Sequence, residues 1–104
     1  MAYVVDRQFV GATVDLDGMV FDGCTFTECR LVFRAEDSVS FNRCTFTNCD
    51  WVFDGAAERA LLYLSALYQG LRPEGSQLVE ALFQNIREGK IGEEVTLPSR
   101  SLAR

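Results

Sequence analysis

The sequence predicts a mainly β protein with C-terminal helices, and three observations lead to this prediction. A decapeptide that begins at Cys24 returns twenty residues later at Cys44, with seven of its ten positions identical. Within that repeat lies a shorter period of five residues, in which a small or medium apolar residue stands two positions before a large one. After residue 53 the apolar residues take the spacing of an amphipathic helix. Because an internal repeat decides architecture before local propensity does, we expect a short solenoid.

The five-residue period predicts one short strand and one turn in each block. Residues two apart on a strand share a face, so each block can direct two side chains inward. Seven of the eight blocks in residues 14–53 fit, and the exception is the block of Arg34 and Glu36, where we expect a loop. Four strands in each twenty residues predict a square coil of about two turns. The expected central residues are Leu16, Phe21, Phe26, Leu31, Phe41, Phe46 and Trp51.

The blocks that pair Cys24 with Phe26 and Cys44 with Phe46 resemble the pentapeptide-repeat family. That family places a small residue, often Ala or Cys, two positions before a central Leu or Phe. The resemblance covers residues 14–53 and implies a right-handed quadrilateral parallel β-helix. Solenoids of this kind carry many unrelated roles, so the resemblance implies a fold more than a function.

We expect the chain to form one domain over residues 1–104, because its length suits a single core. A short solenoid exposes unpaired strand edges at both ends, and repeat arrays usually need caps. Tyr3, Val5 and Phe9 can cover one end and the first helix the other. The expected parts are an N-terminal cap over residues 1–13, the coils over residues 14–53, a helical hairpin over residues 54–89 and a tail over residues 90–104, in which Val95–Leu97 can add a short strand.

The helical hairpin is predicted from apolar spacing and from its end signals. The first helix ends near Gly70, and a turn at Pro73 leads to a second helix that ends at Gly89. Ser76 is the expected N-cap of this second helix, because a serine side chain can accept from its free N–H groups.

The four cysteines are expected to be reduced thiols that fill the core beside the aromatic rings. The N-terminus lacks the basic start and apolar stretch of a signal peptide, so the expected compartment is the cytoplasm. The alternatives are a four-thiolate zinc site, or disulfides between stacked cysteines twenty residues apart. We expect no metal and no cofactor. The cysteines concerned are Cys24, Cys29, Cys44 and Cys49.

An interaction surface is predicted where apolar residues point outward. Two Val-Phe pairs lie on the expected fourth wall of the coil, and a strand that is apolar on both faces is normally buried on both. Either the second helix or another chain must cover this wall. The predicted surface consists of Val32, Phe33, Val52 and Phe53 on the wall and Leu78, Leu82 and Phe83 on the second helix.

The charge distribution limits the classes of partner. All of the net charge of −5 lies in residues 1–55, because the acidic and basic residues of 56–104 balance. An acidic body repels nucleic acid and anionic membrane but can meet a basic protein. No apolar run reaches the roughly 20 residues of a membrane helix. The acidic face is expected to comprise Asp15, Asp17 and Asp37.

An enzyme is not expected. The sequence has no histidine, which is the commonest general base. It also has no phosphate-binding glycine motif. We therefore expect a non-catalytic protein–protein interaction or assembly module that acts as a homodimer, through the apolar wall or the C-terminal helices.

The alternative function, which the resemblance implies, is an acidic DNA-mimic type inhibitor of a nucleic-acid-binding protein such as a type II topoisomerase. Some pentapeptide-repeat proteins are acidic DNA mimics that occupy the DNA-binding saddle of type II topoisomerases. This chain shares the Cys-x-Phe blocks and the acidic sign. It departs in length, because two coils rise only about 10 Å.

Overall fold

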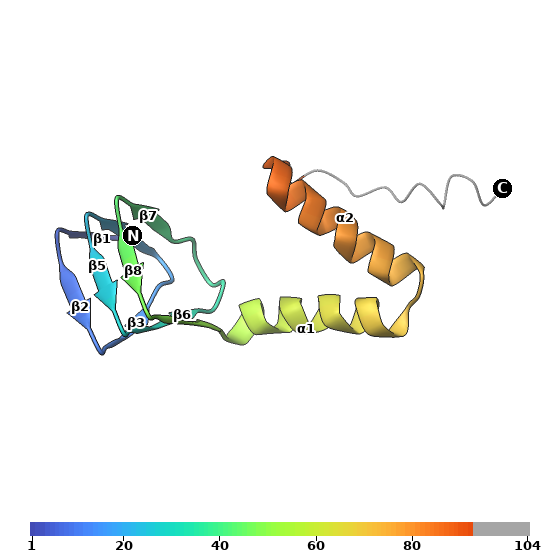
Figure 1. The fold of residues 1–104 in the computed structure, drawn as a ribbon, viewed down its shortest axis with the longest axis horizontal. Coiled ribbons are helices and arrows are strands. Elements are labelled where there is room, and N and C mark those ends of the chain that lie inside the picture. Colours follow the sequence, from blue (N-terminus) through green and yellow to red (C-terminus); the bar gives the residue numbers. More distant parts are fainter. Residues whose placement is uncertain (93–104) are drawn as a thin grey trace. The chain divides into compact units, whose positions relative to one another are not determined.

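The computed structural model describes residues 1–92, in which nine strands form three parallel sheets and two helices follow (Figure 1). The chain divides into two compact units, Met1–Arg59 and Ala60–Arg104. The prediction of a mainly β solenoid with C-terminal helices is confirmed. The strand expected at Val95–Leu97 lies outside the described residues, as does most of the expected tail.

Each sheet takes one strand from each of three successive coils, and all neighbouring strands are parallel. The first sheet holds β1 (Ala2–Val5), β4 (Met19–Asp22) and β7 (Ser40–Asn42). The second holds β2 (Gln8–Val10), β5 (Thr25–Thr27) and β8 (Thr45–Thr47). The third holds β3 (Thr13–Asp15), β6 (Arg30–Phe33) and β9 (Asp50–Phe53).

The N-terminal segment is a complete coil, where the sequence analysis expected a cap over residues 1–13. Val4 pairs with Phe21, Phe9 with Phe26 and Val14 with Leu31. Each of the three N-terminal residues therefore occupies a central inward position. The predicted block at residues 14–18 is wrong in this respect, because Val14 is the central residue of β3, the third strand of the first coil, and does not open a new coil.

Residues in the left-handed backbone conformation lie at the corners of the coil, and their positions explain the spacing between paired strands. Gly18 and Gly23, both with positive φ, are five positions apart. The matching corners Ala35 and Arg43 are eight positions apart. Three extra residues therefore lie in the second coil, so strands pair at an offset of 17 residues first and of 20 afterwards. The corner residues are Asp6, Gly11, Gly18, Gly23, Glu28, Ala35, Arg43, Asn48 and Gly55.

The cross-section has three sheets, where a square coil with four walls was expected. The expected loop at Arg34 and Glu36 is present, because no strand forms in the part of the described chain between β6 and β7. Between β3 and β4 the chain passes through Leu16 and Gly18 without a strand as well. Leu16 still faces inward and is 1% exposed.

Aromatic rings stack through the coils and form the core. Phe26 lies between Phe9 and Phe46, with both ring centroids at 5.1 Å and both interplanar angles at 6°. Phe21 is stacked on Phe41 at 5.6 Å. Parallel strands in register place identical side chains above one another, so one residue type can form a continuous ladder. The central side chains of the middle coil are fully buried, and Phe21, Phe26 and Leu31 are all 0% exposed.

The helices begin and end at identifiable residues. Asp54 accepts from the N–H of Gly55 at 2.9 Å, at the start of α1 (Gly55–Gly70). Pro73 is the N-cap of α2 (Glu74–Glu88), whereas the sequence analysis expected Ser76. The Ser76 hydroxyl instead donates to the carbonyl of Pro73 at 3.0 Å. Gly89 has a left-handed conformation with a φ of 72° and ends α2 as expected.

Candidate interaction surfaces

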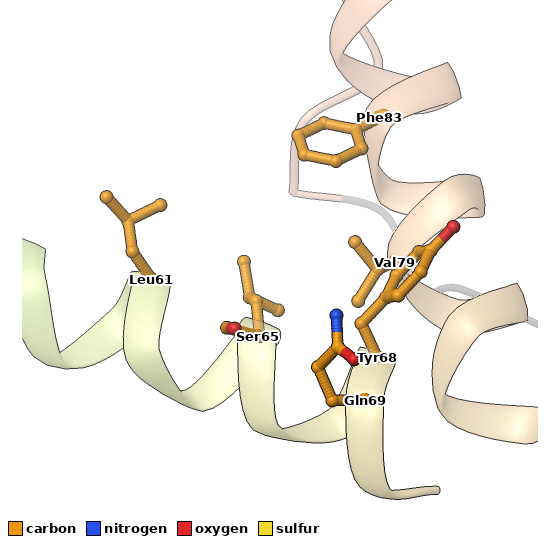
Figure 2. Close-up of a pocket in the computed structure, with 7 residues that line it drawn as sticks. Leu61, Ser65, Tyr68, Gln69, Val79 and Phe83 are labelled. Atoms are coloured by element: carbon orange, nitrogen blue, oxygen red, sulfur yellow. The ribbon is translucent and has the colours of Figure 1, made fainter. Parts of the chain in front are cut away.

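The helical hairpin holds an apolar groove between α1 and α2 (Figure 2). The two helices approach most closely at their connection, because a Cβ atom on Gly75 would collide with the carbonyl of Leu67. Further from the turn they diverge, and a groove of about 240 Å³ opens between them. It is lined by Leu61, Leu64, Ser65, Tyr68, Gln69, Val79 and Phe83.

The hairpin leaves large apolar side chains exposed around this groove. Leu61 is 47% exposed at its edge, and Phe83 is 46% exposed on the facing helix. Ile86, one turn beyond Phe83, is 55% exposed. The sequence from Ala60 to Leu71 contains no charged residue, so this half of α1 offers no solvated charge to balance its apolar surface. Such an apolar patch marks a contact surface.

Of the three predicted residues of the second helix, one lies at this groove. Phe83 lines the groove, and Leu78 and Leu82 are half-buried. Leu61 and Tyr68 of the first helix also line the groove, and the sequence analysis did not name them as interaction residues. The uncharged run from Ala60 to Leu71 was the signal that could have revealed it.

The predicted apolar wall of the coil is smaller than expected. The two Val-Phe pairs do stack in register, with Val32 opposite Val52 and Phe33 opposite Phe53. Val32 is 3% exposed, however, and only Phe53 stays largely open, at 49%. Val32 belongs to the middle strand β6, so a strand lies on either side of it. Trp51, in the last coil, is open to the same degree as Phe53, at 49%.

The three residues of the predicted acidic face come together at the loop between β6 and β7, where they hold the loop. The Asp17 carboxylate accepts from the backbone N–H groups of Arg34 at 2.7 Å, Glu36 at 2.6 Å and Asp37 at 3.2 Å. Asp15 forms an ion pair with the Arg34 guanidinium at 3.0 Å. Asp37 accepts from the N–H of Ser38 at 2.7 Å.

The three backbone N–H donors around Asp17, here called the cradle, control the pKa of its carboxylate. Desolvation acts to raise its pKa, but the hydrogen bonds from Arg34, Glu36 and Asp37 together hold the pKa below its ordinary value of 3.8. On the other side of the loop, the Asp15 carboxylate raises the pKa of Arg34. These carboxylates are thus committed to contacts within the chain.

The four cysteines occupy equivalent places in the coil, and each thiol faces backbone carbonyls. Cys24 donates to Val4 at 3.4 Å, and Cys44, one coil later, donates to Phe21 at 3.5 Å. Cys29 and Cys49 repeat this geometry with Phe9 at 3.3 Å and with Phe26 at 3.4 Å. No group of three or more possible metal-binding side chains occurs among the residues that the structure describes.

No family model, no curated protein and no solved structure matches the sequence. Neither described helix combines the length and apolar character needed to cross a bilayer.

Proposed function

We propose that this protein is a non-catalytic assembly module that acts as a homodimer joined through its helical hairpin. The observation that carries the proposal is the apolar groove between α1 and α2, with exposed side chains at its rim and no charge from Ala60 to Leu71. We further propose that the coils belong to the pentapeptide-repeat family. The in-register Cys-x-Phe ladder supports this membership.

The energetics of the hairpin support a partner. Helices of about 15 residues are marginal in water unless an apolar face is packed against something. In the unit that begins at Ala60, only Gly75 and Val79 are fully buried among the described residues. Burying a Leu or Phe side chain contributes roughly 1.5–3 kcal/mol. If a second chain buries the exposed side chains of Leu61, Phe83 and Ile86, their burial can contribute several kcal/mol to dimer formation.

A second copy is the partner that needs no further assumption, because two-fold homodimers are the commonest closed assemblies. The groove supplies the apolar centre that stable interfaces share. We also propose that the protein works in the cytoplasm, and the four thiols that face carbonyl groups support a reducing compartment.

Acidic DNA mimicry receives no specific support from the geometry. Asp15 and Asp17 are bonded to Arg34 and its loop, and Asp22 forms an ion pair with Arg43 at 2.7 Å. A mimic would have to offer such carboxylates to a basic partner.

Substitution at the groove tests the proposal. Leu61→Glu places a charge at the groove edge, and we expect it to raise the Kd of the dimer by 100-fold or more, on the order of 3 kcal/mol, because a buried charge must be desolvated. Leu62→Glu is the matched control, since Leu62 is adjacent, 61% exposed and does not line the groove.

Sedimentation equilibrium of the full chain at micromolar concentration gives the measurement. The parent and Leu62→Glu should sediment at twice the monomer mass of 11.7 kDa, and Leu61→Glu as monomer. A parent that sediments at 11.7 kDa, or a Leu61→Glu variant that dimerises normally, would refute assembly through the hairpin.

A further inference from the structure

The charges on α2 are arranged in a way that suits a second copy of the same helix. Glu80 and Arg87 are seven residues apart, which is close to two helical turns, so they lie on the same side of α2. Phe83 stands between them in the sequence and lines the groove. The helix therefore carries an acidic and a basic residue along one flank of its exposed apolar side.

We propose that the homodimer pairs α2 with the α2 of a second copy in antiparallel orientation, so that Glu80 of each chain meets Arg87 of the other. This inference rests on the proposed function and adds the orientation of the two chains. In a parallel pair in register, identical residues stand level, so Glu80 would face Glu80 and Arg87 would face Arg87. Reversing one helix replaces both repulsive pairs with attractive ones.

The antiparallel register also places the exposed aromatic residue at the centre of the contact. The midpoint between residues 80 and 87 falls beside Phe83, so the two-fold axis passes near this ring. Phe83 is 46% exposed and Ile86 is 55% exposed, and both would be covered. Buried aromatic side chains at the centre of an interface usually carry most of its binding energy.

Both charged groups have capacity for a partner in the second chain. Among the described residues, the Glu80 carboxylate accepts from the Tyr68 hydroxyl at 2.8 Å through Oε2. This contact fixes the direction of the carboxylate. Among the described residues, Arg87 donates from Nη1 to Gln84 Oε1 at 3.1 Å, and a guanidinium has five donors. Ion pairs at the rim of an interface add little affinity, but they select one orientation over another.

The experiment uses two variants, Arg87→Glu and Glu80→Arg, each with one reversed charge. Each variant is measured alone, and the two are then mixed. Arg87→Glu alone sets Glu80 of each chain against the introduced carboxylate of the other in the antiparallel pair, and we expect a Kd raised roughly tenfold or more. Glu80→Arg alone should have a similar effect. An equimolar mixture restores opposite-charge pairs, but only between unlike copies, so native mass spectrometry should show the heterodimer as the dominant species. Lys90→Glu is the control, because it changes the net charge as Arg87→Glu does but lies outside α2.

The outcomes separate the orientation from the homodimer itself. If Arg87→Glu dimerises as tightly as the parent, or the mixture forms no excess of heterodimer, the antiparallel pairing is wrong. If the parent dimerises and Leu61→Glu is monomeric in that case, the homodimer through the hairpin stands, but its chains are not oriented in this way. A monomeric parent would overturn both proposals.

Discussion

At the scale of single residues, Asp17 has a role that its sequence neighbourhood does not reveal. The Asp15-x-Asp17 pattern predicted an acidic surface, and this much follows from residue type. The three N–H donors come from a loop seventeen or more residues later, so their convergence on Asp17 depends on how the coils stack. The carboxylate fixes the loop that makes the second coil longer than the first.

The lowered pKa of Asp17 predicts a pH dependence of folding stability. Its folded pKa lies below the unfolded value of 3.8, so the contribution of the ionised group is complete above pH 3.8 and is lost as the pH falls through the folded pKa. Asp17→Asn keeps the size but removes the charge, and its amide N–H₂ must face N–H donors. We expect a lower Tm at pH 7 and a flatter decline of Tm in acid.

Circular dichroism melts between about pH 2.5 and 7 would measure this effect, since they extend below the unfolded pKa of 3.8, where the contribution begins to be lost. Asp15→Asn is the control, because the Asp15 side chain is 71% exposed and meets only the Arg34 side chain among its described contacts. Parallel Tm profiles for Asp17→Asn and the parent across this range would contradict the role assigned to the cradle.

At the scale of strands and helices, the sequence predicts an element best where its repeat is regular. Cys24 and Cys44 precede equivalent strands at an offset of twenty residues, so both coils are visible in the sequence. The first coil was missed because its offset is 17 residues and because Arg7 stands where the later coils have cysteine. The five-residue spacing of Val4, Phe9 and Val14 was nevertheless present.

The groove in the hairpin could be predicted only in part. Helical spacing shows which residues of α2 share a face, and Phe83 was named for this reason. The groove itself depends on the close crossing of Gly75 over Leu67, which a pattern within either helix cannot show. Val32 illustrates the opposite error, because it was predicted on an open wall and is only 3% exposed, although Arg30 on the same strand is exposed.

The position of a strand in its sheet predicts the cost of losing an aromatic ring. Phe26 belongs to the middle strand β5 and is 0% exposed, whereas Phe46 belongs to the edge strand β8 and is half-buried. Phe26→Ala should cost about 3–5 kcal/mol in the free energy of unfolding, because it leaves a cavity with rings on both sides. Phe46→Ala should cost less, since water can reach the vacated space.

Urea denaturation followed by circular dichroism can compare the two variants directly. The order of the two midpoints is the decisive result. Equal losses, or a loss below about 1 kcal/mol for Phe26→Ala, would contradict the continuous aromatic ladder.

At the scale of the whole molecule, two surfaces compete as the site of self-association. The coil ends present the edge strands β1, β2 and β3 on one side and β7, β8 and β9 on the other. These edge strands are three or four residues long. Short edges beside charged residues such as Arg7 and Asp50 are a common protection against edge-to-edge pairing. The hairpin groove has no such protection, and this contrast favours it as the dimer contact.

Trp51 can report which surface is used, because it is the sole tryptophan of the chain and lies 49% exposed in the last coil. Pairing through the hairpin leaves its surroundings unchanged, so we expect a constant fluorescence emission maximum across the dilution range in which sedimentation shows dissociation. Pairing through the coil end would bury the indole, and the emission would then shift to the red on dilution. The parent at the dilution where sedimentation shows only monomer supplies the reference spectrum. A red shift that brings the parent to this reference would place the contact at the aromatic end of the coil.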